Sequence, residues 1–205
     1  MRLYFVRHGE SEANLARIFS NRGFQHPLTP KGIAQAEALA ARLAGNQITQ
    51  IFSSPLQRAV QTAEILAQAC AAPVAITDAL REWDVGIFEG TSDPRGWELH
   101  RQVQEDWFVH KLLDHSMPEG ESFLDIQARF IPFIWQLVQN QVRASDAVAL
   151  VGHGGLYHAM LPGLLQNIDY DLMMRYPFAN TAYALAETGP DGLFCREWCG
   201  REIRD

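Results

Sequence analysis

Three short and almost continuous apolar segments recur along the chain, at Leu3–Val6, Ile48–Phe52 and Ala147–Val151. Segments of this kind are typical of strands that are buried on both faces, as in a mostly parallel sheet. The hydrophobic pattern therefore predicts at least three central strands, spread over most of the chain.

Helical periodicity fills the intervals between the apolar segments. Thr29-Pro30 offers an N-cap followed by proline at the first helical position, and an apolar stripe then runs to Gly45. Ser54-Pro55 repeats this device before a second stripe. The stripes consist of Ile33, Ala36, Ala40 and Leu43, and of Leu56, Ala59, Ala63, Leu66 and Cys70. The alternation of strand and helix predicts an α/β fold, a three-layer α/β/α arrangement around a mostly parallel central sheet.

The alternating pattern breaks between residues 83 and 121. Three of the five tryptophans, Trp83, Trp97 and Trp107, fall in this segment among histidines and charged residues. We predict a largely helical cap insertion at 83–121 within one domain that covers 1–205. A helix from about 122 to 140 should follow, with a kink at Pro132. Near the end of the chain, two strands joined at 189–192 are expected to form a hairpin.

Composition narrows the classes of function. The chain has 205 residues, of which 47% are hydrophobic and 20% charged, which is ordinary for a globular domain. A net charge of −7 argues against a nucleic-acid partner but leaves room for a local cationic pocket. The apolar runs are too short for a bilayer or a secretory signal, and three cysteines without a CxxC pair fit free thiols. We expect a cytoplasmic protein without a membrane partner, whose oligomeric state is open, with a homodimer as one option.

Cationic and imidazole side chains stand where the predicted strands end. Arg7 and His8 follow the first strand, Arg58 lies in the first turn of the helix after the second, and His153-Gly154 follows the strand at 147–151. In an open α/β sheet, ligands bind beyond the carboxyl ends of the parallel strands. We therefore expect these groups to share one anion site, to which the helix that begins near Gly154 adds backbone N–H groups.

The mixture of side chains indicates which anion the site binds. Two arginines and two imidazoles around one small group favour a tetrahedral dianion such as a phosphoryl group over a carboxylate. A binding site alone could use lysines and serines, whereas a neutral imidazole is a competent nucleophile near pH 7. The residues therefore favour phosphoryl transfer through a covalent intermediate.

Several short motifs resemble those of a known family. "RHGES" with Asn14, "SSPLQRAVQTA", "LREWDVGIFEG", "PEGES" and "GHGG" resemble, in this order, the motifs of the histidine phosphatase superfamily, the phosphoglycerate mutase-like proteins. The matches run from residue 4 to about 155, and "NTAY" near 180 resembles a further family position.

The resemblance implies a role for each matched residue. His8 would be the nucleophile that becomes phosphohistidine. Arg7, Arg58 and His153 would hold the phosphoryl oxygens, and His153 would donate to the charge that builds during transfer.

Two further roles rest on the resemblance. Asn14 would add a hydrogen bond to the phosphoryl group, and Glu82 would protonate the leaving alkoxide and then accept a proton from water. Glu10, Asp84 and Glu89 are nearby acids that the sequence leaves as alternatives to Glu82. The implied mechanism needs no metal or other cofactor, because arginine and imidazole donors stabilise the transition state.

The chain also departs from the family pattern. "SNRGFQHPLT" brings Asn21-Arg22 and Gln25 where many relatives have a Gln-Gly pair and later an aspartate, and Phe88 replaces a frequent tryptophan. These changes leave the predicted phosphoryl pocket intact but leave the substrate open.

The other histidines show no ligand spacing typical of a metal site. We expect them to be surface, cap or core residues, although His26 could edge the pocket, and we expect Trp97 and Trp107 to pack the cap. These histidines are His26, His100, His110, His115 and His158.

The predicted function is a metal-independent phosphatase that acts on a small phosphorylated metabolite. One alternative is mutase-type phosphoryl transfer, although mutases of the family are longer than 205 residues. The others are a phosphoprotein phosphatase and a non-catalytic phosphate-binding module, which would be expected to lack the nucleophile or the acid.

Overall fold

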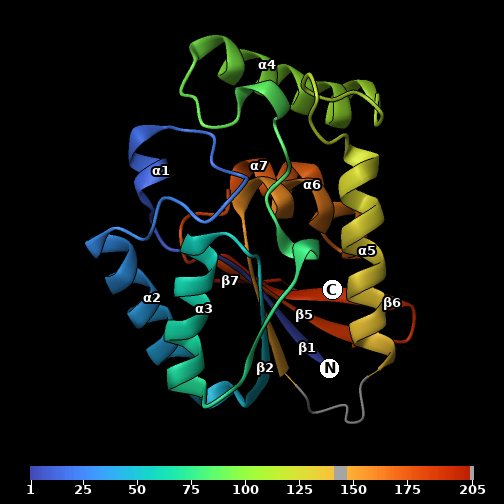
Figure 1. Cartoon of the computed structure of the whole chain (residues 1–205). Helices are drawn as coiled ribbons and strands as arrows, with labels where there is room; N and C mark the ends of the chain where they lie inside the picture. The colour runs from blue at the N-terminus through green and yellow to red at the C-terminus, as the bar shows by residue number, and fades with distance from the viewer. Residues whose placement is uncertain (141–146, 204–205) are drawn as a thin grey trace.

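The computed structural model describes residues 1–140 and 147–203. Within these residues the strands form one seven-stranded sheet in the order β3-β2-β4-β1-β5-β6-β7 (Figure 1). The strands are β1 Arg2–Arg7, β2 Ile48–Ser53, β3 Val74–Ile76, β4 Ala147–Gly152, β5 Tyr183–Gly189, β6 Gly192–Trp198 and β7 Arg201–Glu202. The helices are α1 Glu12–Ala16, α2 Pro30–Leu43, α3 Gln57–Cys70, α4 Pro94–Glu105, α5 Phe123–Gln139, α6 Gly154–Leu164 and α7 Tyr170–Arg175.

The parallel half of the sheet brings the predicted site together. Strands β3, β2, β4 and β1 pair in parallel, and the register sets Arg7 opposite Gly152 and Ser53 opposite Val151. The residues that follow β1, β2 and β4 therefore leave the sheet at the same edge. All three predicted strands are confirmed, and so is the hairpin formed by β5 and β6. The sheet is more mixed than expected, because β5, β6 and β7 pair antiparallel.

Helices cover both faces of the sheet, as the α/β/α prediction requires. Figure 1 shows α2 and α3 on one side and α5 on the other. Alternate residues of β1 point to the two cores: Tyr4 and Val6 pack against α2 and α3, whereas Leu3 and Phe5 pack against α5 and α6. The mixed α/β fold expected from the sequence is confirmed.

Two details of the predicted helices are wrong. Helix α3 begins at Gln57, and Ser54 is not its N-cap. The Ser54 hydroxyl instead accepts the backbone N–H of Leu56 at 3.3 Å in the turn before the helix. In this position the hydroxyl also contacts His153. In α2, where Thr29 is the N-cap as expected, Ile33 lies on the solvent side and is 40% exposed.

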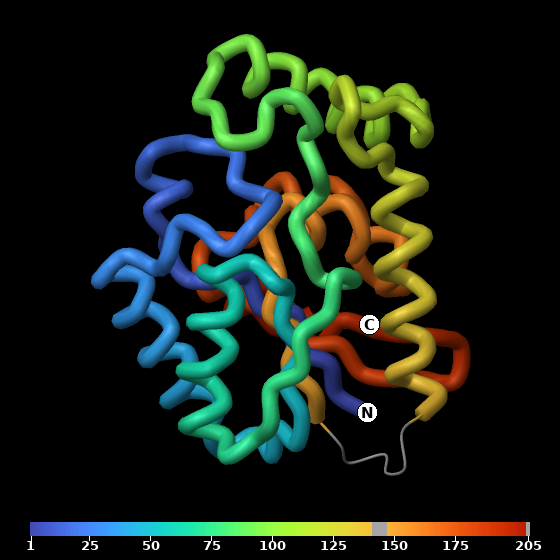
Figure 2. Tube along the Cα trace, viewed as in Figure 1, coloured from blue at the N-terminus to red at the C-terminus, as the bar shows by residue number. Residues whose placement is uncertain are grey.

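The segment between β3 and α5 crosses above the carboxyl edge of the sheet (Figures 1 and 2). It contains α4, which continues into a π-helical turn at Asp106–His110. Trp83 and Trp107 are buried in the same core as α5, so this segment packs as part of the domain. The boundaries 83–121 and 1–205 stay predictions.

Helix α5 begins where the sequence indicates. Ser122 and Asp125 form a capping box at its start. The helix continues through Pro132, which is on the exposed side, where water can reach the carbonyl that proline leaves without a donor. The expected kink stays a prediction.

No helix among the described residues is both long and apolar enough to span a bilayer. Cys70, Cys195 and Cys199 are free thiols, as expected.

Candidate active site

His8 is buried directly after β1, and its hydrogen bonds define its tautomer. Its Nδ1 lies 2.6 Å from the carbonyl oxygen of Gly9, which can only accept, so Nδ1 carries the proton. Nε2 therefore holds the lone pair, and the Nε of Arg58 donates to it at 3.1 Å. An unprotonated Nε2 is the form in which imidazole acts as a nucleophile.

Arg58 is fixed in the first turn of α3 by contacts at both ends of its guanidinium. Nη1 donates to the carbonyl oxygen of Ser20 at 2.7 Å, and Nη2 lies 3.4 Å from Nδ1 of His153. Burial lowers the pKa of Arg58 to about 10, which leaves it cationic at neutral pH. The side chain is only 4% exposed, so its charge is held inside the protein beside His8.

His153 is the last residue before α6 and faces His8. The two ring centroids are 5.0 Å apart with the planes at 61°. The guanidinium of Arg58 can only donate to Nδ1 of His153, so Nε2 carries the proton and donates to the Ser54 hydroxyl at 2.7 Å. The serine that the sequence suggested as a helix cap thus orients the second histidine.

Both histidines are neutral at pH 7. Burial, followed by the charge of Arg58, lowers the pKa of His8 and of His153 well below the ordinary 6.5. A bound dianion would oppose the guanidinium charges and favour a proton on an imidazole. The pocket therefore holds a ready nucleophile and a second imidazole that can gain a proton when an anion binds.

Arg7 has a donor without a partner. Nη1 donates to the carbonyl oxygen of Phe178 at 2.5 Å, whereas Nε is buried and unpaired. A Cβ atom on Gly154 would lie 3.2 Å from Cζ of Arg7, so glycine allows α6 to begin against the guanidinium. A buried donor without a partner is rare in proteins and here fits a bound anion.

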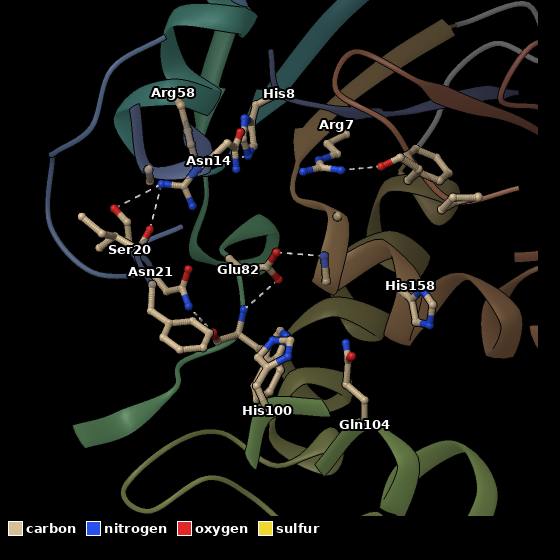
Figure 3. Close-up of a pocket in the computed structure, with 18 of the residues that line it drawn as sticks. Arg7, His8, Asn14, Ser20, Asn21, Arg58, Glu82, His100, Gln104 and His158 are labelled. Carbon is tan, nitrogen blue, oxygen red and sulfur yellow. Dashed lines mark hydrogen bonds between the residues drawn. The ribbon is translucent and has the colours of Figure 1, made fainter. Parts of the chain in front are cut away.

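Glu82 is half-buried in the wall of the pocket, and Figure 3 shows it between His8 and His100. Its two oxygens accept the backbone N–H groups of Trp83 at 3.1 Å and Gly155 at 2.8 Å. A Cβ on Gly155 would lie 2.8 Å from Oε1, so this glycine is required for the contact. Burial raises the pKa of Glu82 above its ordinary value, although both hydrogen bonds and the two arginines lower it. A proton on Glu82 is thus easier to keep than on an exposed carboxyl.

The alternative acids point elsewhere. Glu10 pairs with the exposed Lys31 at 2.8 Å, and Asp84 forms a two-pronged ion pair with Arg22, each contact being 2.7 Å. Glu89 accepts two backbone N–H groups of the neighbouring loop. None of these three acids lines the cavity that contains His8 and Glu82, so they are poor candidates for the proton donor.

His153 is fully buried against Arg58, and the other six predicted residues line a cavity of about 330 Å³. Asn14 lies at its edge, where its Oδ1 accepts from the backbone of Ser11 at 3.1 Å and from Asn180 at 3.2 Å. Asn180 belongs to the "NTAY" motif and also donates to the carbonyl oxygen of His8. The structure thus brings together all seven candidate residues, Arg7, His8, Asn14, Arg58, Glu82, His153 and Gly154.

Sequence reasoning missed part of the wall. Trp97, His100, Gln104 and His158 also line the cavity. Figure 3 shows His100 and Gln104 rising from α4 below Glu82. The expectation that Trp97 only packs the cap, and that His100 and His158 are only surface, cap or core residues, is therefore incomplete. Their position depends on how α4 folds over the sheet, for which the sequence contains no local signal.

The residues that depart from the family pattern support the loop that carries Glu82. Asn21 donates from Nδ2 to the carbonyl oxygen of Trp83 at 2.9 Å, and Arg22 holds Asp84. His26 does not line the cavity, but its Nδ1 lies 2.8 Å from the hydroxyl of Ser20, which does line it.

Among residues 1–140 and 147–203, no group of three or more His, Cys, Asp or Glu side chains is arranged to hold a metal ion.

Comparison with known proteins places the chain in a family. Residues 3–200 match the histidine phosphatase superfamily (branch 1). A probable phosphoglycerate mutase, GpmB, of Proteus mirabilis is 38% identical over 132 residues, which are 63% of this chain and 59% of that protein. A protein of Hydrogenobacter thermophilus that is provisionally named phosphoserine phosphatase 2 is 31% identical over 160 residues, 78% of this chain and 76% of the relative.

Solved structures agree with this assignment. A mycobacterial glucosyl-3-phosphoglycerate phosphatase in complex with VO3 has a TM-score of 0.77 and 26% identity, covering 98% of this chain and 99% of that one. The alpha-ribazole phosphatase of Shigella flexneri has a TM-score of 0.79 and 25% identity, covering 100% and 99%. The chain belongs to the histidine phosphatase superfamily, as its motifs indicated.

Proposed function

We propose that this protein hydrolyses a small phosphomonoester through a phosphohistidine on His8, with Glu82 as the general acid and base. One observation carries the proposal: the unprotonated Nε2 of the buried His8 lies beside Arg58 in a cavity that Glu82 also lines. Nucleophile, cation and proton donor are the three groups that phosphoryl transfer to an imidazole requires.

In the first step, Nε2 of His8 attacks phosphorus while the bond from phosphorus to the ester oxygen breaks. Arg7 and Arg58 hold the phosphoryl oxygens, and the unpaired Nε of Arg7 is a ready donor. Glu82 gives its proton to the leaving oxygen, so the product departs as an alcohol. Nδ1 of His8 keeps its proton and donates it in a hydrogen bond to the carbonyl oxygen of Gly9, which helps to balance the positive charge on the phosphorylated ring.

In the second step, water attacks the phosphohistidine and the P–N bond breaks. Glu82, now ionised, accepts a proton from the water, and the electron pair of the broken bond returns to Nε2 of His8. Inorganic phosphate forms and both residues regain their starting states. His153 stabilises the charge on the phosphoryl oxygens in both steps, and Asn14 and Gly154 add hydrogen bonds at the edge of the group.

We infer that the reaction needs no metal ion. Arg7, Arg58 and His8 line the cavity and His153 contacts Arg58, so these groups can supply the charge stabilisation that a cation provides in other phosphoryl-transfer enzymes.

Mutase activity is the second candidate. It is favoured by the 38% identity to a probable phosphoglycerate mutase, although the match spans 59% of that protein. A mutase would return the phosphoryl group from His8 to a bound product instead of to water.

Phosphate release from a panel of phosphomonoesters in excess EDTA tests the proposal. We expect turnover by the wild type, loss of turnover in His8→Ala, and retention in the control variant His110→Ala, which removes an exposed histidine. Absence of phosphate release from every ester would contradict hydrolysis, and isomerisation of phosphoglycerate in the same samples would support the mutase. Phosphate binding without either reaction would indicate a binding module.

A further inference from the structure

The charged side chains of the cavity are concentrated at its phosphoryl end. Among the described residues that line it, Arg7 and Arg58 are the two arginines, and no lysine is present. Both arginines lie at the proposed position of the phosphoryl group. The remaining charged group is the carboxyl of Glu82. A second anion on the substrate would therefore find no cationic side chain of its own inside the cavity.

The two imidazoles in the outer part of the cavity do not change this balance. Burial lowers the pKa of His100 to about 4 and also lowers the pKa of His158. Both rings are therefore neutral at pH 7 and act as hydrogen-bonding and stacking groups.

Several aromatic side chains line the rest of the cavity. Phe19 stacks on Trp97 with centroids 4.0 Å apart and planes at 22°, and Trp83 stacks on His100 at 4.5 Å and 26°. Gln104 adds an amide that points from α4 toward the cavity (Figure 3). Such a wall offers apolar surface with a few neutral hydrogen-bonding groups.

Two further arginines line a neighbouring hollow. They are Arg17 and Arg101, and the hollow shares Trp97, His100 and Gln104 with the cavity. The guanidinium of Arg17 lies 5.9 Å from the centre of the Trp97 ring, and Arg101 pairs with a glutamate on its own helix. Neither residue lines the cavity that contains His8.

We propose that the preferred substrate is the phosphate ester of an uncharged alcohol that presents an apolar or aromatic face to Phe19, Trp83 and Trp97. This inference rests on the proposed function and specifies the substrate of the same site. A carboxylate or a second phosphate near the ester would lose water without gaining a partner, and it would also approach Glu82. Esters such as phosphoserine and phosphoglycerate should therefore be poor substrates.

Two esters with the same benzyl core test the proposal in the wild-type protein. Benzyl phosphate and 4-carboxybenzyl phosphate differ in one carboxylate, which is remote from the reacting bond. We expect kcat/KM to be at least about tenfold higher for benzyl phosphate, because the carboxylate enters the cavity without a counter-ion. Equal or higher kcat/KM for the carboxylated ester would overturn the inference and leave the phosphatase proposal standing. No phosphate release from either ester, or from the wider panel, would overturn both.

A charge placed in the wall provides an independent check. In Gln104→Lys, kcat/KM for the carboxylated ester should rise at least about fivefold relative to that for benzyl phosphate, because the lysine would pair with the carboxylate. Gln102→Lys adds the same charge to the exposed side of α4 and should leave the ratio unchanged. An unchanged ratio in a folded Gln104→Lys protein, or the same change in both variants, would contradict the proposed position of the alcohol.

Discussion

At the scale of single residues, burial and nearby charges shift the pKa values of His8 and Glu82 in opposite directions. His8 is kept neutral because burial and Arg58 disfavour its protonated form, so its pKa lies well below 6.5. Burial acts on Glu82 in the opposite sense, since it disfavours the ionised carboxylate and raises the pKa. A nucleophile without a proton and an acid with one can therefore coexist over a wider pH range than in water.

The raised pKa of Glu82 predicts how activity depends on pH. The protonated form is the active acid, so kcat/KM for an alkyl phosphate should fall as pH rises through this pKa, above the ordinary value of 4.5. Glu82→Gln should lower kcat/KM by about 10²–10⁴ at low pH. The measurement is the ratio of wild-type to variant kcat/KM across pH, in which the effect of substrate ionisation cancels because both proteins share the substrate.

That ratio should decrease toward high pH, and the loss should be much smaller for 4-nitrophenyl phosphate, whose leaving group needs little protonation. A ratio that is constant with pH would contradict the role of Glu82.

The residues that could be predicted from sequence are those that follow strand ends. Arg7, His8 and His153 were identified because parallel strands deliver their carboxyl ends to one edge of the sheet. Glu82 depended on the family resemblance, since four acids lie in similar loops. His100 could not be found at all, because its place in the wall depends on a helix packed over the site.

At the scale of elements, the close approach of β1 to α2 holds the nucleophile. Gly9 follows His8, and a Cβ there would lie 2.5 Å from the carbonyl oxygen of Gly32 in the first turn of α2. A Cβ on Gly32 would lie 1.9 Å from the carbonyl oxygen of Glu10. The backbone on either side therefore requires glycine, and α2 supports the turn that orients His8.

Gly32→Ala should therefore lower both stability and activity. The added methyl group forces α2 away from the turn after β1, at a cost of about 1–3 kcal/mol in the free energy of unfolding. Urea denaturation measures this cost, and kcat on the best ester should fall because His8 loses its alignment. Gly45→Ala is the control, since a Cβ there meets nothing within 4 Å. Equal effects of the two substitutions would show that the contact with Glu10 is unimportant.

Sequence patterns predicted most elements but not how the connecting loops pack. The sequence predicts Thr29 as an N-cap, because its side chain satisfies the first N–H groups of the helix locally, and it places the start of a later helix near Ser122. Ser54 was misread as a cap, since its hydroxyl serves the turn and His153, and this contact joins residues far apart in the chain. The ion pair of Arg22 with Asp84 is likewise a long-range contact.

At the scale of the whole molecule, a net negative protein contains a concentrated positive site. The chain carries −7, yet the half-buried Arg7 and the buried Arg58 lie at the edge where the parallel strands end. Burial lowers the pKa of both arginines because it disfavours their charged forms. An anion that binds there should stabilise the fold as a whole.

Inorganic phosphate should therefore raise the melting temperature. At a phosphate concentration of 100 times Kd, the stabilisation is about 2.7 kcal/mol. Differential scanning calorimetry should show a rise of several degrees in the wild type and most of it lost in Arg58→Gln. Arg42→Gln removes an exposed arginine outside the cavity and should retain the full rise. The same rise in Arg58→Gln would indicate that phosphate binds elsewhere.

The most direct test of the account is to trap the covalent intermediate. Wild-type protein is mixed with 4-nitrophenyl phosphate, quenched in alkali within milliseconds to seconds, and analysed by peptide mass spectrometry. The account predicts one phosphoryl group per chain, stable to alkali and labile to acid, on His8 and absent in His8→Ala. Continued phosphate release with no phosphorylated His8 at any time, or unchanged turnover in His8→Ala, would contradict it.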